Sequence, residues 1–221
     1  TYGNLTKQTN WGSVTASLDG TFTDIGNDSS ITDISYASST GSYVVGLPSG
    51  EITTDQFSHK VSETRYYYDG LSLGYATLGN QTMMEKWVNG TTYVNTQKSY
   101  NSYGLPTSMT DERGKVTTST YDTYYLYPVI VTNPLSQTTT YLYNYASGKV
   151  ASATDPNNRT VSTVYDGLGR VIEEKQSDTV NPLIQVLKTS YAYNDTFGAV
   201  SVQKTSYLDG FNTVDSYTYF D

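Results

Sequence analysis

The chain lacks cysteine altogether and has one histidine among its 221 residues. The absence of cysteine excludes disulfides, thiol nucleophiles and thiolate metal sites. Because His59 stands alone, no metal centre can be built from several histidines, and we expect it to be a solvated residue of a polar turn. No apolar run is long enough to span a bilayer, so we expect no membrane insertion by this segment.

Basic residues are also scarce. Lys and Arg number 13 against 21 Asp and Glu, which gives a formal net charge of −8. Binding to a phosphate backbone or to an anionic membrane needs clustered Lys and Arg, and the chain has no such cluster. We therefore expect no nucleic-acid partner.

The ordinary core formers are few, whereas tyrosine is abundant. Leu, Ile, Val and Phe together make 44 of the 221 residues. So low a share of these residues, taken alone, is typical of disordered chains. The 23 tyrosines offset this shortage, because their rings pack on a pleated surface while the hydroxyl still reaches a polar partner. The composition predicts a thin, aromatic core spread along the chain.

Short stretches recur at a spacing of 22 residues. One set consists of Thr110-Asp111-Glu112, Thr132-Asn133-Pro134 and Thr154-Asp155-Pro156, and the other of Thr120-Tyr121-Asp122, Leu142-Tyr143-Asn144 and Val164-Tyr165-Asp166. A fixed period of this length indicates one supersecondary unit copied along the chain. It favours an architectural role over an enzymatic one, and we expect neither catalytic residues nor a cofactor.

Residues 149–170 show how one unit is built. An alternating stretch, 149–154, and a β-branched stretch, 159–165, flank the turn formers Asp155-Pro156-Asn157-Asn158 and predict a hairpin. The proline has the φ that the second turn position needs, and the two asparagines tolerate the positive φ that closes such turns. The two glycines of Tyr165-Asp166-Gly167-Leu168-Gly169-Arg170 then predict a tight reversal into the next hairpin.

The remainder of the chain follows the same pattern less regularly. We expect an all-β, single array over 1–221, with irregular longer repeats in 1–99, regular repeats in 100–175 and stretched repeats in 176–221. Within the first part, residues 42–48 resemble a first strand, 59–69 a second strand ending in Tyr68-Asp69, and 70–99 one enlarged connection. Both ends of the chain lie within such units, so we expect it to be a piece of a longer protein.

The Tyr-Asp pairs and the Gly-x-Gly-Arg sequence resemble the Rhs or YD-repeat family. The residues that carry the resemblance are Tyr68, Asp69, Tyr121, Asp122, Tyr143, Asp155, Pro156, Tyr165, Asp166, Gly167, Gly169 and Arg170. The family includes bacterial Rhs polymorphic toxins, the B and C subunits of insecticidal Tc toxins, wall-associated bacterial proteins and teneurins. The resemblance implies tandem hairpins in one curved or spiralling antiparallel sheet, part of a shell-like architecture, in which these residues are structural.

The resemblance also implies a function. It predicts a structural module of a secreted or cell-surface protein, most naturally bacterial, that forms part of a shell or scaffold enclosing or displaying a toxin or effector. The partners would be the rest of its own array and an enclosed C-terminal effector, with self-assembly through sheet edges as a further route. The chain has no match to the aspartate-bearing core segment with which toxin members cleave themselves, so no protease site is carried over.

Three other interpretations stay open. The tyrosines could form an exposed face of an adhesin or carbohydrate-binding module, since aromatic rings stack on sugars and the family has been linked to glycans. The acidic pairs Asp111-Glu112 and Glu173-Glu174 could be read as carboxylates for glycoside hydrolysis, although adjacent strand residues point to opposite faces. A loop rich in oxygen ligands offers a weak calcium candidate, formed by Asp24, Asn27, Asp28 and Asp33.

Overall fold

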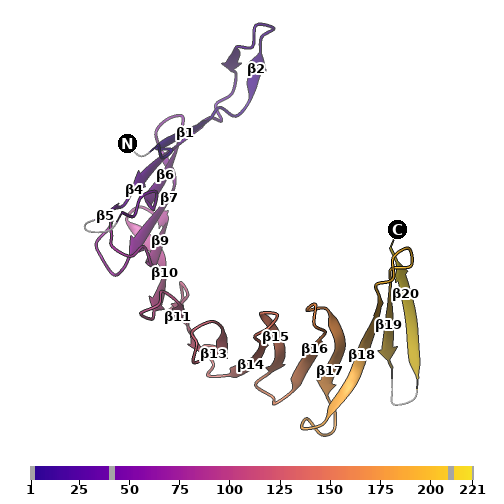
Figure 1. The fold of residues 1–221 in the computed structure, drawn as a ribbon. Helices are drawn as coiled ribbons and strands as arrows, with labels where there is room; N and C mark the ends of the chain where they lie inside the picture. Colours follow the sequence, from indigo (N-terminus) through magenta and orange to yellow (C-terminus); the bar gives the residue numbers. More distant parts are fainter. Residues whose placement is uncertain (1–2, 40–42, 209–211, 221) are drawn as a thin grey trace. The chain divides into compact units, whose positions relative to one another are not determined.

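The computed structural model describes residues 3–39, 43–208 and 212–220, and all of their regular structure is β-strand (Figure 1). The prediction of an all-β chain of successive hairpins is confirmed. No helix occurs in these residues, and so none that could cross a membrane. The chain divides into two compact units, 1–117 and 118–221, with the boundary inside strand β12 (Val116–Tyr121). The expectation of one uninterrupted array over 1–221 stays a prediction.

The first unit contains a sheet in which the hydrogen-bonded order of the strands is β1-β4-β6-β7-β9-β10-β11. Its neighbouring strands pair antiparallel. The strands of this sheet are β1 (Lys7–Asn10), β4 (Ser30–Tyr36), β6 (Pro48–Asp55), β7 (Lys60–Tyr68), β9 (Gln81–Asn89), β10 (Thr92–Tyr100) and β11 (Pro106–Thr110).

Two small strand pairs accompany this sheet. Strands β2 (Val14–Ala16) and β3 (Phe22–Asp24) form a separate antiparallel hairpin. Strands β5 (Ser38–Ser39) and β8 (Tyr75–Ala76) pair in parallel. These pairs lie in the part of the chain whose sequence period is irregular.

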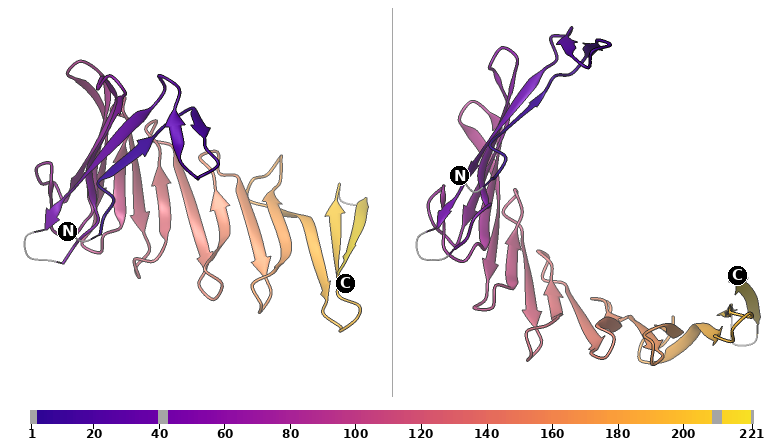
Figure 2. Two further views of the ribbon diagram at one scale, coloured as in Figure 1. Left: turned by 90° about the horizontal axis from the view of Figure 1, so that it is seen from above. Right: turned by 45° about the horizontal axis from the view of Figure 1, so that its top comes forward.

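The second unit is a plain antiparallel succession in which β12 to β20 pair in chain order. Figure 2 shows that the connections of these later strands lie alternately at one end of the strands and at the other. After β12, the strands are β13 (Pro128–Thr132), β14 (Thr138–Asn144), β15 (Lys149–Thr154), β16 (Thr160–Tyr165), β17 (Val171–Ser177), β18 (Gln185–Asn194), β19 (Ser201–Tyr207) and β20 (Thr213–Tyr219).

Two details of the first unit differ from the expectations. Residues 70–99 are not one connection, because β9 and most of β10 lie within them, joined through the two-residue loop Gly90-Thr91. A two-residue loop that begins with glycine is a common hairpin connection, and this signal outweighs the missing Tyr-Asp ending. The strand expected over 42–48 is also wrong: residues 43–47 are irregular and β6 begins at Pro48, while Ser42 lies outside the described residues.

Burial is slight throughout the sheet. Among the described residues, the buried apolar side chains are Ala37, Tyr68 and Ala76, with exposures of 9%, 5% and 1%. A sheet with so little covered surface is stabilised mainly by the pairing of each strand with its neighbours. The core is thin, as the composition predicts, but it is not spread along the chain: among the described residues it is one cluster of the first unit, in which half-buried Tyr66 and Leu47 pack against Tyr68 and the two alanines.

Candidate functional site

One kind of turn closes many of the strand connections, and Asp155 shows its geometry. The backbone N–H of Asp155 donates to the carbonyl of Arg159 (2.9 Å), and its carbonyl accepts from the N–H of Asn158 (3.0 Å). Its side-chain Oδ1 accepts from the N–H groups of Asn157 (2.9 Å) and Arg159 (2.8 Å). A single carboxylate oxygen therefore holds the turn closed by satisfying two backbone donors.

The same pair of side-chain bonds, to the second and fourth following N–H groups, occurs at other Asp and Asn residues. These are Asp55, Asn101, Asp111, Asn133 and Asp166. Between Asn133, Asn144, Asp155 and Asp166 the spacing is 11 residues. The physical repeat is thus one strand with one turn, and the 22-residue period in the sequence spans two of them.

The fourth position of this turn takes a positive φ. The residues there are Ser58, Gly104, Gly114, Ser136, Asn158 and Gly169, with φ of 65°, 77°, 73°, 60°, 62° and 76°. The prediction of positive φ is confirmed for Asn158 and wrong for Asn157, because only the fourth position of the turn adopts it. Gly169 occupies the left-handed region, whereas Gly167 does not. Pro156 lies at the second turn position, as its fixed φ requires.

The turn carboxylates are stabilised in their charged form. The N–H of Arg159 is the main cause that lowers the pKa of Asp155 below its usual value, and the N–H of Arg170 does the same for Asp166. Arg170 adds its guanidinium, which contacts Asp166 at 2.8 Å and Asp195 at 2.6 Å. Where asparagine replaces aspartate, the carbonyl oxygen supplies the same acceptor without the charge.

Two Tyr-Asp pairs deviate from this geometry. The turn after Tyr121 is one residue longer, so Asp122 bonds to the carbonyl of Tyr127 (3.0 Å) and its Oδ2 accepts from the hydroxyl of Tyr145 (2.6 Å). This hydrogen bond raises the pKa of Tyr145 to about 12. Asp69 closes no short turn: its carboxylate accepts from four consecutive backbone N–H groups, from Thr77 to Asn80. Burial alone would raise the pKa of Asp69, but these bonds lower it.

At four positions, the tyrosine that precedes the Asp or Asn donates its hydroxyl to a backbone carbonyl of the sheet. Tyr68 donates to the carbonyl of Pro48 (2.8 Å), Tyr100 to Gln81 (2.8 Å), Tyr165 to Val150 (2.9 Å) and Tyr193 to Val171 (2.8 Å). The acceptor lies at the start of the preceding strand in every case. Each ring thus spans the end of one strand and the beginning of its neighbour.

Cations cover two of these rings. The guanidinium of Arg170 lies 4.1 Å from the ring centroid of Tyr193, and the Nζ of Lys149 lies 5.4 Å from that of Tyr165. Each cation immediately precedes the residue whose carbonyl the tyrosine binds. The cation and the hydrogen bond therefore hold the ring from two sides.

A cluster of charged side chains around Glu63, in the first unit, was not anticipated from the sequence. Glu63 is only 7% exposed, and its carboxylate accepts from Lys60 (2.7 Å), Arg65 (2.6 Å) and the hydroxyl of Tyr93 (2.7 Å). Burial alone would raise the pKa of Glu63, but these three bonds lower it to about 2. Because Glu63 belongs to β7 and Tyr93 to β10, the cluster ties these two strands together across the intervening β9.

Three of the four calcium candidates have a structural partner. Asp28 accepts from Ser13, Asp24 from the N–H of Gly26, and Asp33 faces Lys7 at 3.5 Å. Within the described residues, no three of the His, Cys, Asp and Glu side chains are placed to hold a metal ion, and the four calcium candidates are not brought together as a site.

His59 and three of the four residues of the acidic pairs also make local contacts. The His59 side chain is 77% exposed, and its Nδ1 lies 3.1 Å from Asp55. Glu173 pairs with Lys175 at 2.6 Å, while Glu174 accepts from the hydroxyl of Tyr191 at 3.1 Å. Asp111 closes a turn and binds the guanidinium of Arg113.

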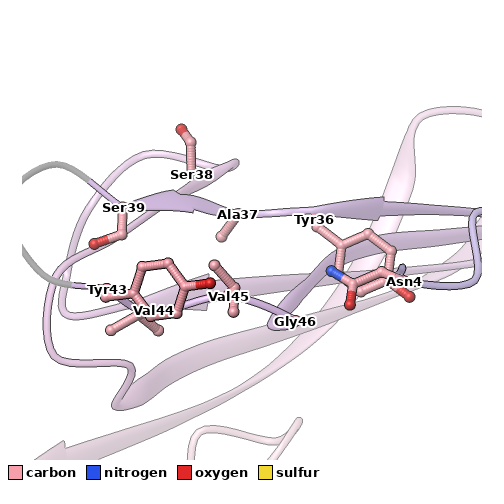
Figure 3. Close-up of a pocket in the computed structure, with 9 residues that line it drawn as sticks. All are labelled: Asn4, Tyr36, Ala37, Ser38, Ser39, Tyr43, Val44, Val45 and Gly46. Atoms are coloured by element: carbon pink, nitrogen blue, oxygen red, sulfur yellow. The ribbon is translucent and has the colours of Figure 1, made fainter. Parts of the chain in front are cut away.

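A shallow cavity of about 380 Å³ lies beside the short strand β5 (Figure 3). Its lining residues are Asn4, Tyr36, Ala37, Ser38, Ser39, Tyr43, Val44, Val45 and Gly46. Two tyrosines, an asparagine, two serines, aliphatic side chains and a glycine line it, and none of these residues is Asp, Glu, Lys, Arg or His.

No protein-family model and no curated protein matches the chain. Among solved structures, the crystal structure of TcdB2-TccC3 resembles it with a TM-score of 0.46 and 13% identity, over 82% of this chain and 11% of that chain. The crystal structure of TcdB2-TccC3-Cdc42 matches with the same score and identity over 80% of this chain and 10% of that one. The crystal structure of TcdB2-TccC3 without its hypervariable C-terminal region does so over 86% and 11%. The chain therefore spans about a tenth of these chains, and a likeness of this degree assigns it neither family nor function.

Proposed function

We propose that the chain is a structural repeat module of a large secreted or cell-surface protein of the YD-repeat kind. It forms part of a β-sheet wall that encloses or displays a toxin or effector. Its partners are the rest of its own repeat array and that effector, and none of its residues has a catalytic role. The net charge of −8 argues against nucleic acid as a further partner.

This proposal rests on the contacts that the repeated Asp and Tyr side chains make. The turn carboxylate of Asp155 and the hydroxyl of Tyr193 both bind backbone of their own sheet. Side chains that serve a ligand or a reaction are directed toward a cavity with convergent polar groups. Here the recurrent residues are consumed in building turns and in joining strands, which is the property of a scaffold.

Electron microscopy of the full-length protein that contains this chain tests the proposal. A closed particle with internal density supports a wall around an effector, and that density should disappear when the segment C-terminal to the repeats is deleted. An open rod or fibre refutes enclosure. Limited proteolysis adds an independent readout, because an enclosed segment is protected until the particle is opened by denaturant.

We propose carbohydrate binding as the second candidate, on the basis of two rings in β20. Tyr217 and Tyr219 are 54% and 74% exposed, and their ring planes differ by only 16° with centroids 6.4 Å apart. Two nearly parallel exposed rings on one strand face are suited to stacking on sugar rings.

A glycan array probed with this chain, followed by NMR titration of any hit, tests the second candidate. Tyr217→Ala and Tyr219→Ala should abolish the shifts. Tyr141→Ala, whose ring packs beside Tyr143 at 6.5 Å in β14, serves as the control and should leave them unchanged. Absence of binding to any glycan on the array removes this candidate.

A further inference from the structure

Many of the strands have a tyrosine at or near their end, and a β-bulge lies beside that tyrosine. The register shifts by one residue between Leu142 and Tyr143, so that Tyr143 pairs with Val150 and an extra residue is left on the following strand. Corresponding shifts give the pairs Tyr36–Pro48, Tyr68–Gln81, Tyr100–Pro106, Tyr121–Pro128 and Tyr165–Val171. A bulge interrupts the ladder, and backbone groups beside it need other partners.

The tyrosine hydroxyls go to these same bulges. Pro48, which faces Tyr36, accepts from Tyr68. Gln81, which faces Tyr68, accepts from Tyr100. In the second unit, Val150 faces Tyr143 and accepts from Tyr165, whereas Val171 faces Tyr165 and accepts from Tyr193. In these four cases, the hydroxyl of a tyrosine therefore binds the carbonyl at the bulge where the strand-ending tyrosine of the preceding repeat is paired.

We propose that these hydroxyls are inter-repeat latches: each hydroxyl stabilises the bulge of the preceding repeat, and its removal loosens that repeat rather than its own strand. Such a latch explains why tyrosine, and not phenylalanine, stands at these positions, since only the hydroxyl can reach a carbonyl. The inference concerns how the repeats are joined, and it holds whether the chain belongs to a wall or to a glycan-binding protein.

One position differs in a way that fits the latch. Tyr143 has no hydroxyl hydrogen bond within the described part of the chain, and its ring stacks on Tyr127 with centroids 4.4 Å apart. Tyr127 belongs to the turn that is one residue longer than the others. The extra residue brings an additional ring to this point, and ring stacking replaces the hydroxyl contact there.

Tyr193→Phe tests the latch, and Tyr191→Phe is its matched control. Both tyrosines lie in β18, are half-buried and are two residues apart, which places them on one face of the strand. The hydroxyl of Tyr191 binds the Glu174 side chain, whereas that of Tyr193 binds the Val171 carbonyl. Both variants thus lose one hydroxyl, but Tyr191→Phe breaks a bond to a side chain and Tyr193→Phe breaks a bond to the backbone at a bulge.

Hydrogen exchange of the whole chain, resolved by residue, is the measurement. In Tyr193→Phe, amides of residues 163–173 should exchange about 2- to 12-fold faster, the range that corresponds to one net hydrogen bond, while those of β20 stay unchanged. In Tyr191→Phe, residues 163–173 should keep their protection at the bulge. Three results would each overturn the latch: equal changes in exchange for the two variants, a loss of protection that is uniform over the chain, or a loss of protection confined to β18.

Tyr68→Phe repeats the test in the first unit. Tyr68 is 5% exposed, so its partner Pro48 would be left with a poorly solvated carbonyl. We expect faster exchange around Tyr36 and Pro48, on the strands that precede β7. Unchanged exchange there would show that the hydroxyl bond does not stabilise the bulge, and would overturn the latch.

Discussion

Substituting the two glycines of one turn by alanine should have opposite effects on stability. Gly169 has a φ of 76°, and an added Cβ would lie 3.5 Å from the Cβ of Ser147, which is an ordinary contact. The cost therefore comes from conformation alone: about 1–2 kcal/mol for placing an L-residue in the left-handed region. The lower entropy of the unfolded alanine chain offsets about 0.4–1 kcal/mol of this. Gly169→Ala should thus lose about 1 kcal/mol.

Gly167 is the internal control, since it lies two residues away in the same turn. Its φ is outside the left-handed region, and a Cβ there meets nothing within 4 Å. Gly167→Ala should therefore be neutral or gain up to about 1 kcal/mol. Gly169→Val should lose more than Gly169→Ala, because a branched Cβ tolerates positive φ poorly.

Urea unfolding of the whole chain, followed by far-UV circular dichroism, measures both changes. The midpoint should fall for Gly169→Ala and hold or rise for Gly167→Ala, with equal slopes. If the unfolding is not two-state, exchange of the amides in residues 160–176 gives the local value. Equal losses at the two glycines, or no loss at Gly169, would refute the argument from φ.

Three further predictions concern the turns and the Glu63 cluster. Ser136→Gly should raise the urea midpoint by the equivalent of about 1 kcal/mol, because Ser136 occupies the same left-handed position with a φ of 60°; an unchanged midpoint would contradict this. The lowered pKa of Asp155 means that its contribution is present above the unfolded pKa and lost as pH falls through the folded pKa. Asp155→Asn keeps the acceptor oxygen and should hence change stability little at pH 7. It should reduce the loss of stability that the wild type shows as the pH falls below about 4, the usual pKa of aspartate, as followed by urea titrations at several pH values. Glu63→Gln should lose about 2–3 kcal/mol at pH 7, and the difference should vanish as the pH approaches the Glu63 pKa of about 2; a loss that is independent of pH would refute the ionic origin.

Turn chemistry could be predicted from the sequence because it is local. Asp155, Pro156 and Asn158 lie within four consecutive positions, and each has the conformational preference that its place in the turn requires. The hairpins followed directly from these turns. The hairpin closed by Gly90-Thr91 lacks the Tyr-Asp ending, so the repeat pattern did not predict it, although its glycine is a local turn signal.

The sequence by itself determined the fold class, the period and the residues that close the turns, since these depend on backbone preferences over a few neighbouring residues. The tertiary structure alone decided where the bulges fall, which carbonyl each tyrosine hydroxyl binds, and that Tyr93 joins Glu63 across 30 residues of sequence. Those contacts depend on strand register, and register is set by the pairing of whole strands. A one-residue slip would move every side chain to the other face, so no single segment contains that information.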